Sequence, residues 1–424
     1  MRILVYSLNY APELTSTGKY TGEMAAWLAA RGHEVHVIAP PPHYPQWQVD
    51  EAYRGRGFHM EMLEGVKVFR TPLYVPRPER VSARRRIAYE MSFCMAVLAR
   101  WLPRWISLHR YDVVIAVCPP VQLGLWPWCY QMFRRVPWVF HIQDLQVDAA
   151  YRLGMLRNGP FVRCLYRTEG FLLRQASAIS TITEPMRRRI MERGVPGDRI
   201  WLTPNWANLE LIEPGPSDNV FRRQLQVGTD RVLVMYAGNV GVKQGLEVVL
   251  DTADRLRNES RVHFALIGSG AASGLLEAKA KQLNLPNLTM LPVQPREKLA
   301  TMLGAADVHL VVQKRAAADL VMPSKLTNIL AAGRPAIATA DAGTALEHVL
   351  SAYDAGLVCE PDDPDALGHA IQTLLDRPDR RRQMGYNARR YATEQLNQDV
   401  ILEAFEAKLG RLTFPNRANL EPGR

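Results

Sequence analysis

Cysteines are few in this sequence, and long apolar runs are missing. The five cysteines are scattered without a C-x-x-C pair, which argues against a disulfide framework or a structural zinc site and fits a reducing compartment. No stretch approaches the roughly 18 consecutive apolar residues of a membrane-spanning helix. The apolar run at residues 1–6 is shorter than a secretory signal. We therefore expect a cytoplasmic protein, peripheral on the inner face of the membrane.

Acidic residues are outnumbered by lysine and arginine, which gives a net charge of +10 and a pI near 9.4. This balance suits anionic partners such as nucleic acid, acidic lipid headgroups or phosphorylated substrates, and does not choose among them. The length of 424 residues and the 47% hydrophobic content fit a globular protein with two hydrophobic cores.

Apolar strand-like runs alternate with helical patterns in both halves of the chain, which is typical of parallel α/β folds. Between the halves, residues 203–219 are rich in proline, glycine and asparagine and are interpreted as a linker. We expect two Rossmann-like domains whose parallel sheets face a central cleft. The predicted parts are an amino-terminal domain (1–205), a second domain (206–379), helices that pack back on the first domain (380–412) and a disordered tail (413–424).

Two segments of the first half are candidates for chemistry. The loop that ends at Thr17 and Gly18 precedes a helix, where hydroxyl and backbone N–H groups can bind an anion; a simple helix cap explains the same residues. His141 ends an apolar strand, at the sheet edge where site residues gather, and Asp144 follows it. We assign His141 a catalytic role, with a structural histidine as the alternative.

Glycines surround a lysine after the first strand of the second half. Gly238, Asn239 and Lys243 lie in the turn that leads to a helix, and Gly268 ends the next strand. Lysine is a mobile positive charge suited to a diphosphate. We expect these residues to bind the diphosphate of a donor substrate; the alternative is a tight turn with a solvated lysine.

The second half contains a stronger candidate for an anion site. Pro323 and Ser324 begin a predicted helix, because proline in the first turn needs no hydrogen-bond partner for its nitrogen. The free N–H groups there, with Ser324 and Lys325 beside them, predict a phosphate site, and Asn328 can bind a ribose. A purely structural helix start is the alternative. Asp319 can accept hydrogen bonds from sugar hydroxyls. We expect neither a metal nor another cofactor.

Arginines alternate with large apolar residues between Arg77 and Arg110, with Glu79 and Glu90 as the only acids. At helical spacing this pattern indicates a helix in the interface of an anionic membrane. A core helix with a solvated basic face is the alternative. No recognition motif supports nucleic-acid binding. The apolar members are Phe93, Met95, Leu98, Trp101, Leu102, Trp105 and Ile106.

Several longer motifs together resemble the retaining glycosyltransferases of family 4, which have the GT-B fold. They are Leu14-Thr-Ser-Thr-Gly-Lys-Tyr-Thr-Gly-Glu-Met24, Pro41-Pro-His-Tyr-Pro-Gln-Trp47, His141-Ile-Gln-Asp144, Lys243-Gln-Gly245 and Pro323-Ser-Lys-Leu-Thr-Asn-Ile-Leu330. Within that family they are similar to the WcaI-type transferases of colanic acid and related exopolysaccharide synthesis. The resemblance covers most of residues 1–410. It implies a GDP-fucose donor and an undecaprenyl-diphosphate-linked sugar acceptor at the cytoplasmic membrane face.

The resemblance also implies roles for individual residues. Thr17 and Gly18 border the donor phosphates and the acceptor, His141 lies near the transferred sugar, and Lys243 holds the diphosphate.

The sequence departs from the family pattern in the second half. Asn239 replaces a common arginine. Asn328 stands where the second glutamate of a Glu-x7-Glu pair is usual, and Asp319 lies near the first. We expect Lys325 to supply the missing positive charge.

We predict a retaining glycosyl transfer in which His141, Lys243 and Asp319 are the catalytic residues. Charge that develops on the leaving β-phosphate would be stabilised electrostatically by the lysines. Three alternatives remain: another donor such as a UDP-linked N-acetylfucosamine, a nucleotide-sugar epimerase of the same fold, and a non-catalytic binding module.

Overall fold

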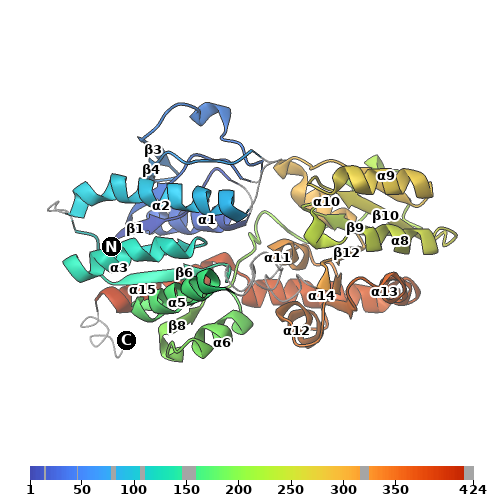
Figure 1. Cartoon of the computed structure of the whole chain (residues 1–424). Coiled ribbons are helices and arrows are strands. Elements are labelled where there is room, and N and C mark those ends of the chain that lie inside the picture. Colours follow the sequence, from blue (N-terminus) through green and yellow to red (C-terminus); the bar gives the residue numbers. More distant parts are fainter. Residues whose placement is uncertain are drawn as a thin grey trace, which may run out of the picture. The chain divides into compact units, whose positions relative to one another are not determined.

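The computed structural model describes residues 1–13, 16–44, 46–77, 83–105, 110–145, 159–315 and 324–414. The chain forms two compact units (Figure 1). Residues 1–204 and 401–424 make up the first unit, and residues 205–400 the second. Each unit is built around its own sheet and is described separately.

The first unit contains an eight-stranded sheet in the order β3-β4-β2-β1-β5-β6-β7-β8. Neighbouring strands are parallel except the β3–β4 pair, and the central strands are buried on both faces, which explains their continuous apolar sequences. The strands are β1 (Arg2–Tyr6), β2 (Glu34–Ala39), β3 (His59–Leu63), β4 (Val66–Arg70), β5 (Val113–Cys118), β6 (Trp138–Ile142), β7 (Ala178–Thr181) and β8 (Ile200–Leu202).

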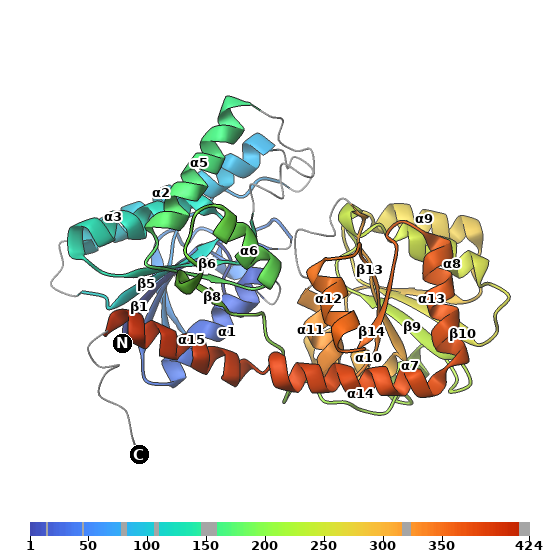
Figure 2. The same ribbon diagram turned by 90° about the horizontal axis from the view of Figure 1, so that it is seen from below.

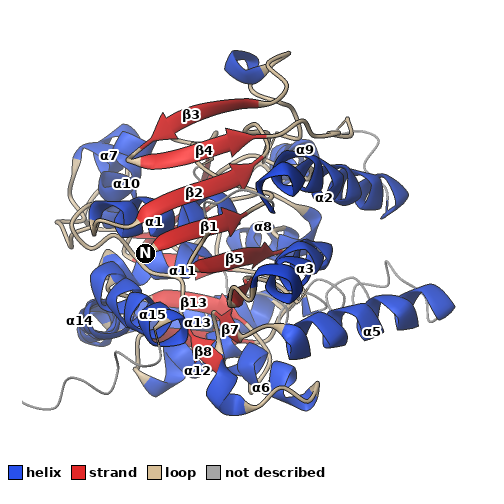
Figure 3. Ribbon diagram, turned by 90° about the vertical axis from the view of Figure 1, so that its left-hand side faces the viewer, coloured by secondary structure: helices blue, strands red, loops and turns tan. Residues whose placement is uncertain are grey.

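Helices cover both faces of this sheet. In Figure 3, α1 and α15 lie on one face, and α2, α3 and α5 lie on the other. The buried ring of Trp101 packs 5.0 Å from Tyr6 and 4.6 Å from Tyr130, which fixes α2 on the sheet. The helices are α1 (Ser16–Ala30), α2 (Ala83–Trp105), α3 (Leu125–Arg134), α5 (Pro160–Gln175), α6 (Glu184–Glu192) and α15 (Gln398–Thr413).

The second unit has a six-stranded parallel sheet in the order β11-β10-β9-β12-β13-β14. Helices α8, α9 and α13 cover one face, and α7, α10, α11, α12 and α14 cover the other (Figure 2). The strands are β9 (Val232–Ala237), β10 (Val262–Ile267), β11 (Leu288–Leu291), β12 (Val308–Val311), β13 (Ala336–Thr339) and β14 (Gly356–Cys359). The helices are α7 (Val220–Gln224), α8 (Glu247–Arg255), α9 (Ser273–Leu283), α10 (Leu299–Ala305), α11 (Ser324–Ala331), α12 (Ala345–Ala352), α13 (Pro364–Asp376) and α14 (Pro378–Gln395).

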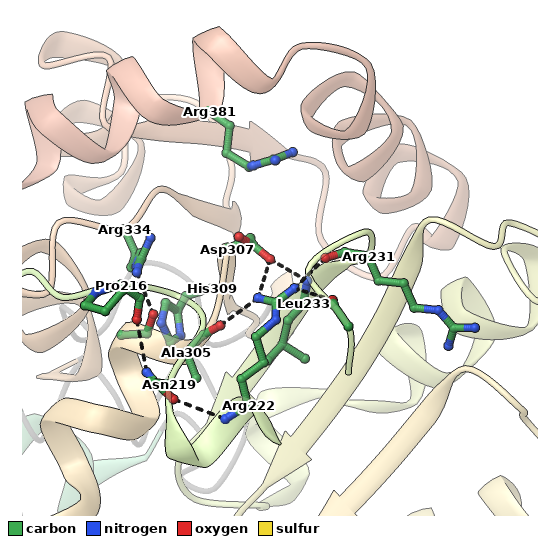
Figure 4. Close-up of polar contacts among 12 residues, drawn as sticks. Pro216, Asn219, Arg222, Arg231, Leu233, Ala305, Asp307, His309, Arg334 and Arg381 are labelled. Atoms are coloured by element: carbon green, nitrogen blue, oxygen red, sulfur yellow. Dashed lines mark hydrogen bonds and ion pairs between the residues drawn. The ribbon is translucent and has the colours of Figure 1, made fainter. Parts of the chain in front are cut away.

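A buried arginine joins the amino-terminal ends of β9 and β12 (Figure 4). Arg222 is 2% exposed, and its guanidinium donates to the Asp307 carboxylate at 2.8 Å and to the Ala305 carbonyl at 3.0 Å. The same carboxylate accepts the Leu233 N–H at 2.8 Å. Ligands of parallel sheets bind at the opposite, carboxyl ends of the strands, so this cluster is structural.

The predicted carboxyl-terminal helical stretch differs from the structure. It consists of two helices. Helix α14 packs on α11 within the second unit, whereas α15 belongs to the first unit from residue 401 onward. The apolar runs of the sequence predict strands at 34–39, 66–70, 138–142 and 336–339, and the structure has strands with these bounds. They do not predict strands β3, β8 and β14. Most of the predicted tail, residues 415–424, lies outside the described residues.

Candidate functional site

Two loops at the carboxyl ends of β9 and β10 touch backbone to backbone in the second unit. The Gly238 N–H donates to the Ile267 carbonyl, and the Val240 N–H to the Ser269 carbonyl, both at 2.9 Å. Gly268 has a φ of +154°, and a Cβ on it would lie only 1.9 Å from the Gly238 carbonyl oxygen. Only glycine fits there, so Gly268 holds the loop that carries the predicted phosphate contacts.

Lys243 lies in the short 3-10 turn η5 (Val242–Gln244) of this loop, with an exposed side chain. The backbone of the turn is fixed. The Lys243 carbonyl accepts the Lys314 N–H at 3.0 Å, and the Gln244 side chain accepts the Gly241 N–H at 3.2 Å. A lysine on a fixed turn is suited to a phosphate group, as predicted for this residue.

Lys325, in the first turn of α11, points its ammonium group toward β9. Its Nζ is buried, has no hydrogen-bond partner among the described residues, and lies 3.7 Å from the centre of the Tyr236 ring. A Cβ on Gly238 would lie 3.7 Å from this nitrogen. Burial lowers the pKa of Lys325 to about 7. The structure thus brings Lys325 and Gly238, two of the predicted donor-binding residues, into direct proximity.

The remaining predictions on this segment are placed only in part. Asn328 is half-buried, and its side-chain oxygen has no partner among the described residues. Helix α11 begins at Ser324, as predicted, but the side chain of Ser324 is not among those described. Asp319 and Pro323 lie outside the described residues.

His141 is buried in β6 of the first unit. Its Nδ1 donates to the Ser180 hydroxyl at 3.0 Å, and Ser180 donates onward to Thr203. The Gln143 amide donates to His141 Nε2 at 2.6 Å. Burial lowers the pKa of His141 to about 4, so the imidazole is neutral at pH 7 with both nitrogens engaged. Its predicted catalytic role near the transferred sugar stays a prediction.

A buried glutamate near the start of the chain is a feature that the sequence analysis missed. The Glu13 carboxylate accepts the N–H groups of His43 and Tyr44 at 2.9 and 3.0 Å and the Asn9 amide at 2.9 Å. Gly18 leaves room for it, since a Cβ there would lie 2.9 Å from a Glu13 oxygen. Glu13 therefore fixes the loop that contains His43. The sequence signal for this loop was the motif Pro41–Trp47, which belongs to the family resemblance but was given no role there.

The same loop is tied to α2. His43 donates from Nδ1 to the Pro41 carbonyl at 2.9 Å, and the Tyr89 hydroxyl donates to Nε2 at 2.6 Å. The Trp47 ring lies 5.3 Å from the Tyr89 ring. Burial lowers the pKa of His43, which favours the neutral ring that this arrangement needs. Thr17, half-buried in α1, contributes no described contact to this cluster.

Helix α2 contains most of the arginine-rich segment between Arg77 and Arg110, and some of its apolar residues face the core while others face the surface. Phe93 and Trp101 are fully buried, so the prediction that they enter a membrane is wrong. Met95 and Leu102 are exposed by 55% and 50%. Together with Ile87, Met91 and the exposed Arg84 they form an outward stripe at helical spacing, the α2 stripe. Leu98 is half-buried, and the side chains of residues 103–109 are not described.

Two further properties concern the described residues only. None of their helices is long and apolar enough to cross a membrane. No group of three or more His, Cys, Asp or Glu side chains among them is arranged to hold a metal ion.

Two family models match the two halves of the chain. The model described as a glycosyl transferase 4-like domain matches residues 16–206, and the model described as glycosyl transferases group 1 matches residues 217–391.

The chain is similar to two named glycosyltransferases, to the first of them over nearly its whole length. It is 38% identical, over 96% of this chain and 98% of the relative, to the Escherichia coli (strain K12) protein named as a colanic acid biosynthesis glycosyl transferase, WcaI. It is 24% identical to the glycosyltransferase WbjE of Pseudomonas aeruginosa, over 63% of this chain and 67% of the relative.

Solved structures share the fold. Sucrose-phosphate synthase from Thermosynechococcus elongatus superposes with a TM-score of 0.74 at 20% identity, covering 98% of this chain and 99% of that one. Anabaena HepE in complex with UDP superposes with a TM-score of 0.71 at 15% identity, covering 97% and 100%.

Proposed function

Because the chain belongs to the glycosyltransferases of GT-B fold and has WcaI as a close relative, we propose that it transfers fucose from GDP-fucose to a lipid-diphosphate-linked sugar in exopolysaccharide synthesis. The activity class rests on the family. The single structural observation that carries the donor proposal is the buried Lys325 ammonium, which lies beside the glycine loop of Gly238 and has no hydrogen-bond partner in the part of the chain that the structure describes. A buried cation without a counter-ion is costly, and a diphosphate would supply one.

The chemistry follows from the groups around that loop. When the sugar leaves, negative charge develops on the β-phosphate, and the carbon becomes oxocarbenium-like. Lys243, exposed on its fixed turn, and Lys325 on α11 stabilise this charge, because they are positioned before the reaction begins. We propose that the acceptor hydroxyl attacks from the face that the diphosphate leaves, which retains the configuration.

The base and sugar of the donor are the finer part of the proposal. GDP-fucose is the donor implied by the resemblance of the sequence motifs to the WcaI-type transferases, whereas HepE, which shares the fold, was solved in complex with UDP. A UDP-linked sugar is therefore the second donor to assay. Asn328, with an unpartnered side-chain oxygen among the described residues, is the proposed ribose contact.

The α2 stripe supports a lipid-linked acceptor. Four exposed apolar side chains follow one face of α2, and Arg84 and Arg85 lie at its first turn. Apolar residues in the acyl boundary beside arginines near anionic headgroups are typical of helices that bind membranes peripherally. We propose that this surface holds the enzyme at the cytoplasmic face of the membrane, where the acceptor is anchored.

The test is transfer by the purified protein, supplied with GDP-fucose or a UDP-sugar and a lipid-diphosphate-linked sugar. We expect Lys243→Ala to lower kcat/KM by about 100-fold or more, the typical loss when a group that stabilises transition-state charge is removed. The matched control is Lys281→Ala, which removes another exposed lysine of the same unit, on α9.

Two outcomes would contradict the proposal. Full activity of Lys243→Ala would remove this lysine from the donor site. An isomerised sugar nucleotide formed without any acceptor would instead indicate an epimerase.

A further inference from the structure

Tyr236 lies between the two predicted phosphate-binding segments of the second unit. It is the penultimate residue of β9 and is fully buried. Its hydroxyl donates a hydrogen bond to the Asn239 carbonyl at 2.7 Å, and the Lys325 ammonium lies over its ring at 3.7 Å. One side chain thus contacts both the glycine loop and the lysine of α11.

The hydroxyl contact adds to the backbone hydrogen bonds of Gly238 and Val240 that hold this loop against the end of β10. Gly238 and Asn239 are exposed. Gly238 has a φ of +152°, and as a glycine it has no side chain whose contacts could hold the backbone in place. The hydrogen bond from Tyr236 orients the Asn239 peptide.

The ring contact determines the environment of Lys325. The aromatic face attracts the ammonium group, while burial beside the ring removes the water that would otherwise solvate it. Burial lowers the pKa of Lys325 to about 7, and the phenol of Tyr236, whose own pKa is raised by burial, stays neutral. The lysine therefore lies where an incoming anion would stabilise its charge.

We propose that Tyr236 is a positioning residue for the donor: its hydroxyl holds the 238–245 loop and its ring holds Lys325, so that both contact the same diphosphate. This inference rests on the proposed donor function. A tyrosine that merely fills the core would need neither the hydroxyl contact nor the lysine above its ring.

The test measures binding of GDP and UDP by calorimetry, in buffers of different ionisation enthalpy at pH 8. At this pH the nucleotide phosphates are already deprotonated, since their last pKa is near 6. We expect the wild-type protein to take up roughly half to one proton per bound nucleotide, because Lys325 becomes charged on binding. Lys325→Met should abolish this uptake.

Variants of Tyr236 separate its two contacts. Tyr236→Phe keeps the ring and loses the hydroxyl, so we expect affinity to fall about five-fold, the effect of one hydrogen bond, with proton uptake retained. Tyr236→Leu should weaken binding further and remove the uptake, because water can then solvate the lysine. Tyr391→Phe is the control: its ring pairs with Tyr353 at 4.4 Å, in a different part of the same unit.

Each outcome has a distinct meaning. If the wild-type protein binds neither nucleotide, the donor function itself is wrong. If it binds one, but Tyr236→Phe and Tyr391→Phe bind equally well with unchanged melting temperatures, the positioning role of Tyr236 is overturned and the donor function stands. Binding without proton uptake would overturn the assignment of Lys325 as the group that gains charge, even if Tyr236→Leu does not fold.

Discussion

At the scale of single residues, the shape of the donor loop depends on a glycine outside it. Gly268 lies after β10, yet its missing Cβ is what allows the Gly238 carbonyl to approach. We expect Gly268→Ala to push the 238–245 loop away and to strain its own backbone at a φ of +154°. The unfolding free energy should fall by about 1–3 kcal/mol, and nucleotide affinity should fall with it.

Gly274 provides a control with the opposite sign. It lies in α9, where an added Cβ meets nothing within 4 Å. Gly274→Ala should therefore raise the unfolding free energy by up to about 1 kcal/mol, because alanine is the better helix former. Denaturant unfolding of the two variants checks the pair. Equal effects of both substitutions would show that loop contact at Gly268 is unimportant.

Sequence patterns located some of these residues and missed others for a physical reason. Gly238 and Lys243 were recognisable because glycine and lysine after a strand have few structural explanations. Tyr236 and Glu13 were missed. A tyrosine within a strand is indistinguishable from a core residue, and the partners of Glu13 are some 30 positions away in the chain. Sequence indicates a group's chemistry, but only folding determines its partner.

At the scale of elements, periodicity predicted α2 but not its orientation. Tryptophan and methionine are both apolar in a sequence pattern, and the larger Trp101 occupies the core while Met95 faces outward.

The break between α14 and α15 had a clearer signal in the sequence. The Asn397 side chain accepts the Asp399 N–H at 2.9 Å and so caps the new helix. Strand β8, of three residues, is too short for an alternating pattern to show.

The α2 stripe gives a prediction at this scale. In a sedimentation assay with vesicles rich in phosphatidylglycerol, we expect the wild-type protein to bind, and binding to weaken as salt rises. The double variant Met91→Glu/Met95→Glu should lose about ten-fold in vesicle affinity or more, because two carboxylates would have to enter the apolar boundary.

The control for this assay is Met191→Glu, which changes a methionine of α6 that is 42% exposed and lies outside the stripe. Both variants should keep wild-type melting temperatures, since the replaced side chains face solvent. If the double variant binds vesicles as tightly as Met191→Glu does, the stripe is not the membrane surface.

At the scale of the whole molecule, each unit buries a neutral histidine in its own sheet. His141 in β6 has a pKa lowered to about 4 by burial. His309 in β12, 1% exposed and donating to the Leu303 carbonyl at 2.9 Å, also has a pKa lowered to about 4 by burial. The two units therefore share one source of acid sensitivity, although their cores are separate.

Acid should accordingly destabilise both units over the same pH range. An unfolded histidine binds its proton near pH 6.5, whereas the folded ones do so only near pH 4. Between these values the unfolded chain holds more protons, so stability falls as pH falls, by about 1.4 kcal/mol per pH unit for each histidine, and the loss is complete below pH 4.

His309→Asn should flatten this dependence in the second unit alone, and His141→Asn in the first alone. His369→Asn, an exposed position on α13, should leave the slope unchanged. Urea unfolding from pH 7 to pH 4, followed by fluorescence and by hydrogen exchange of each unit, measures these slopes; a dependence that survives in His309→Asn would have to come from other groups.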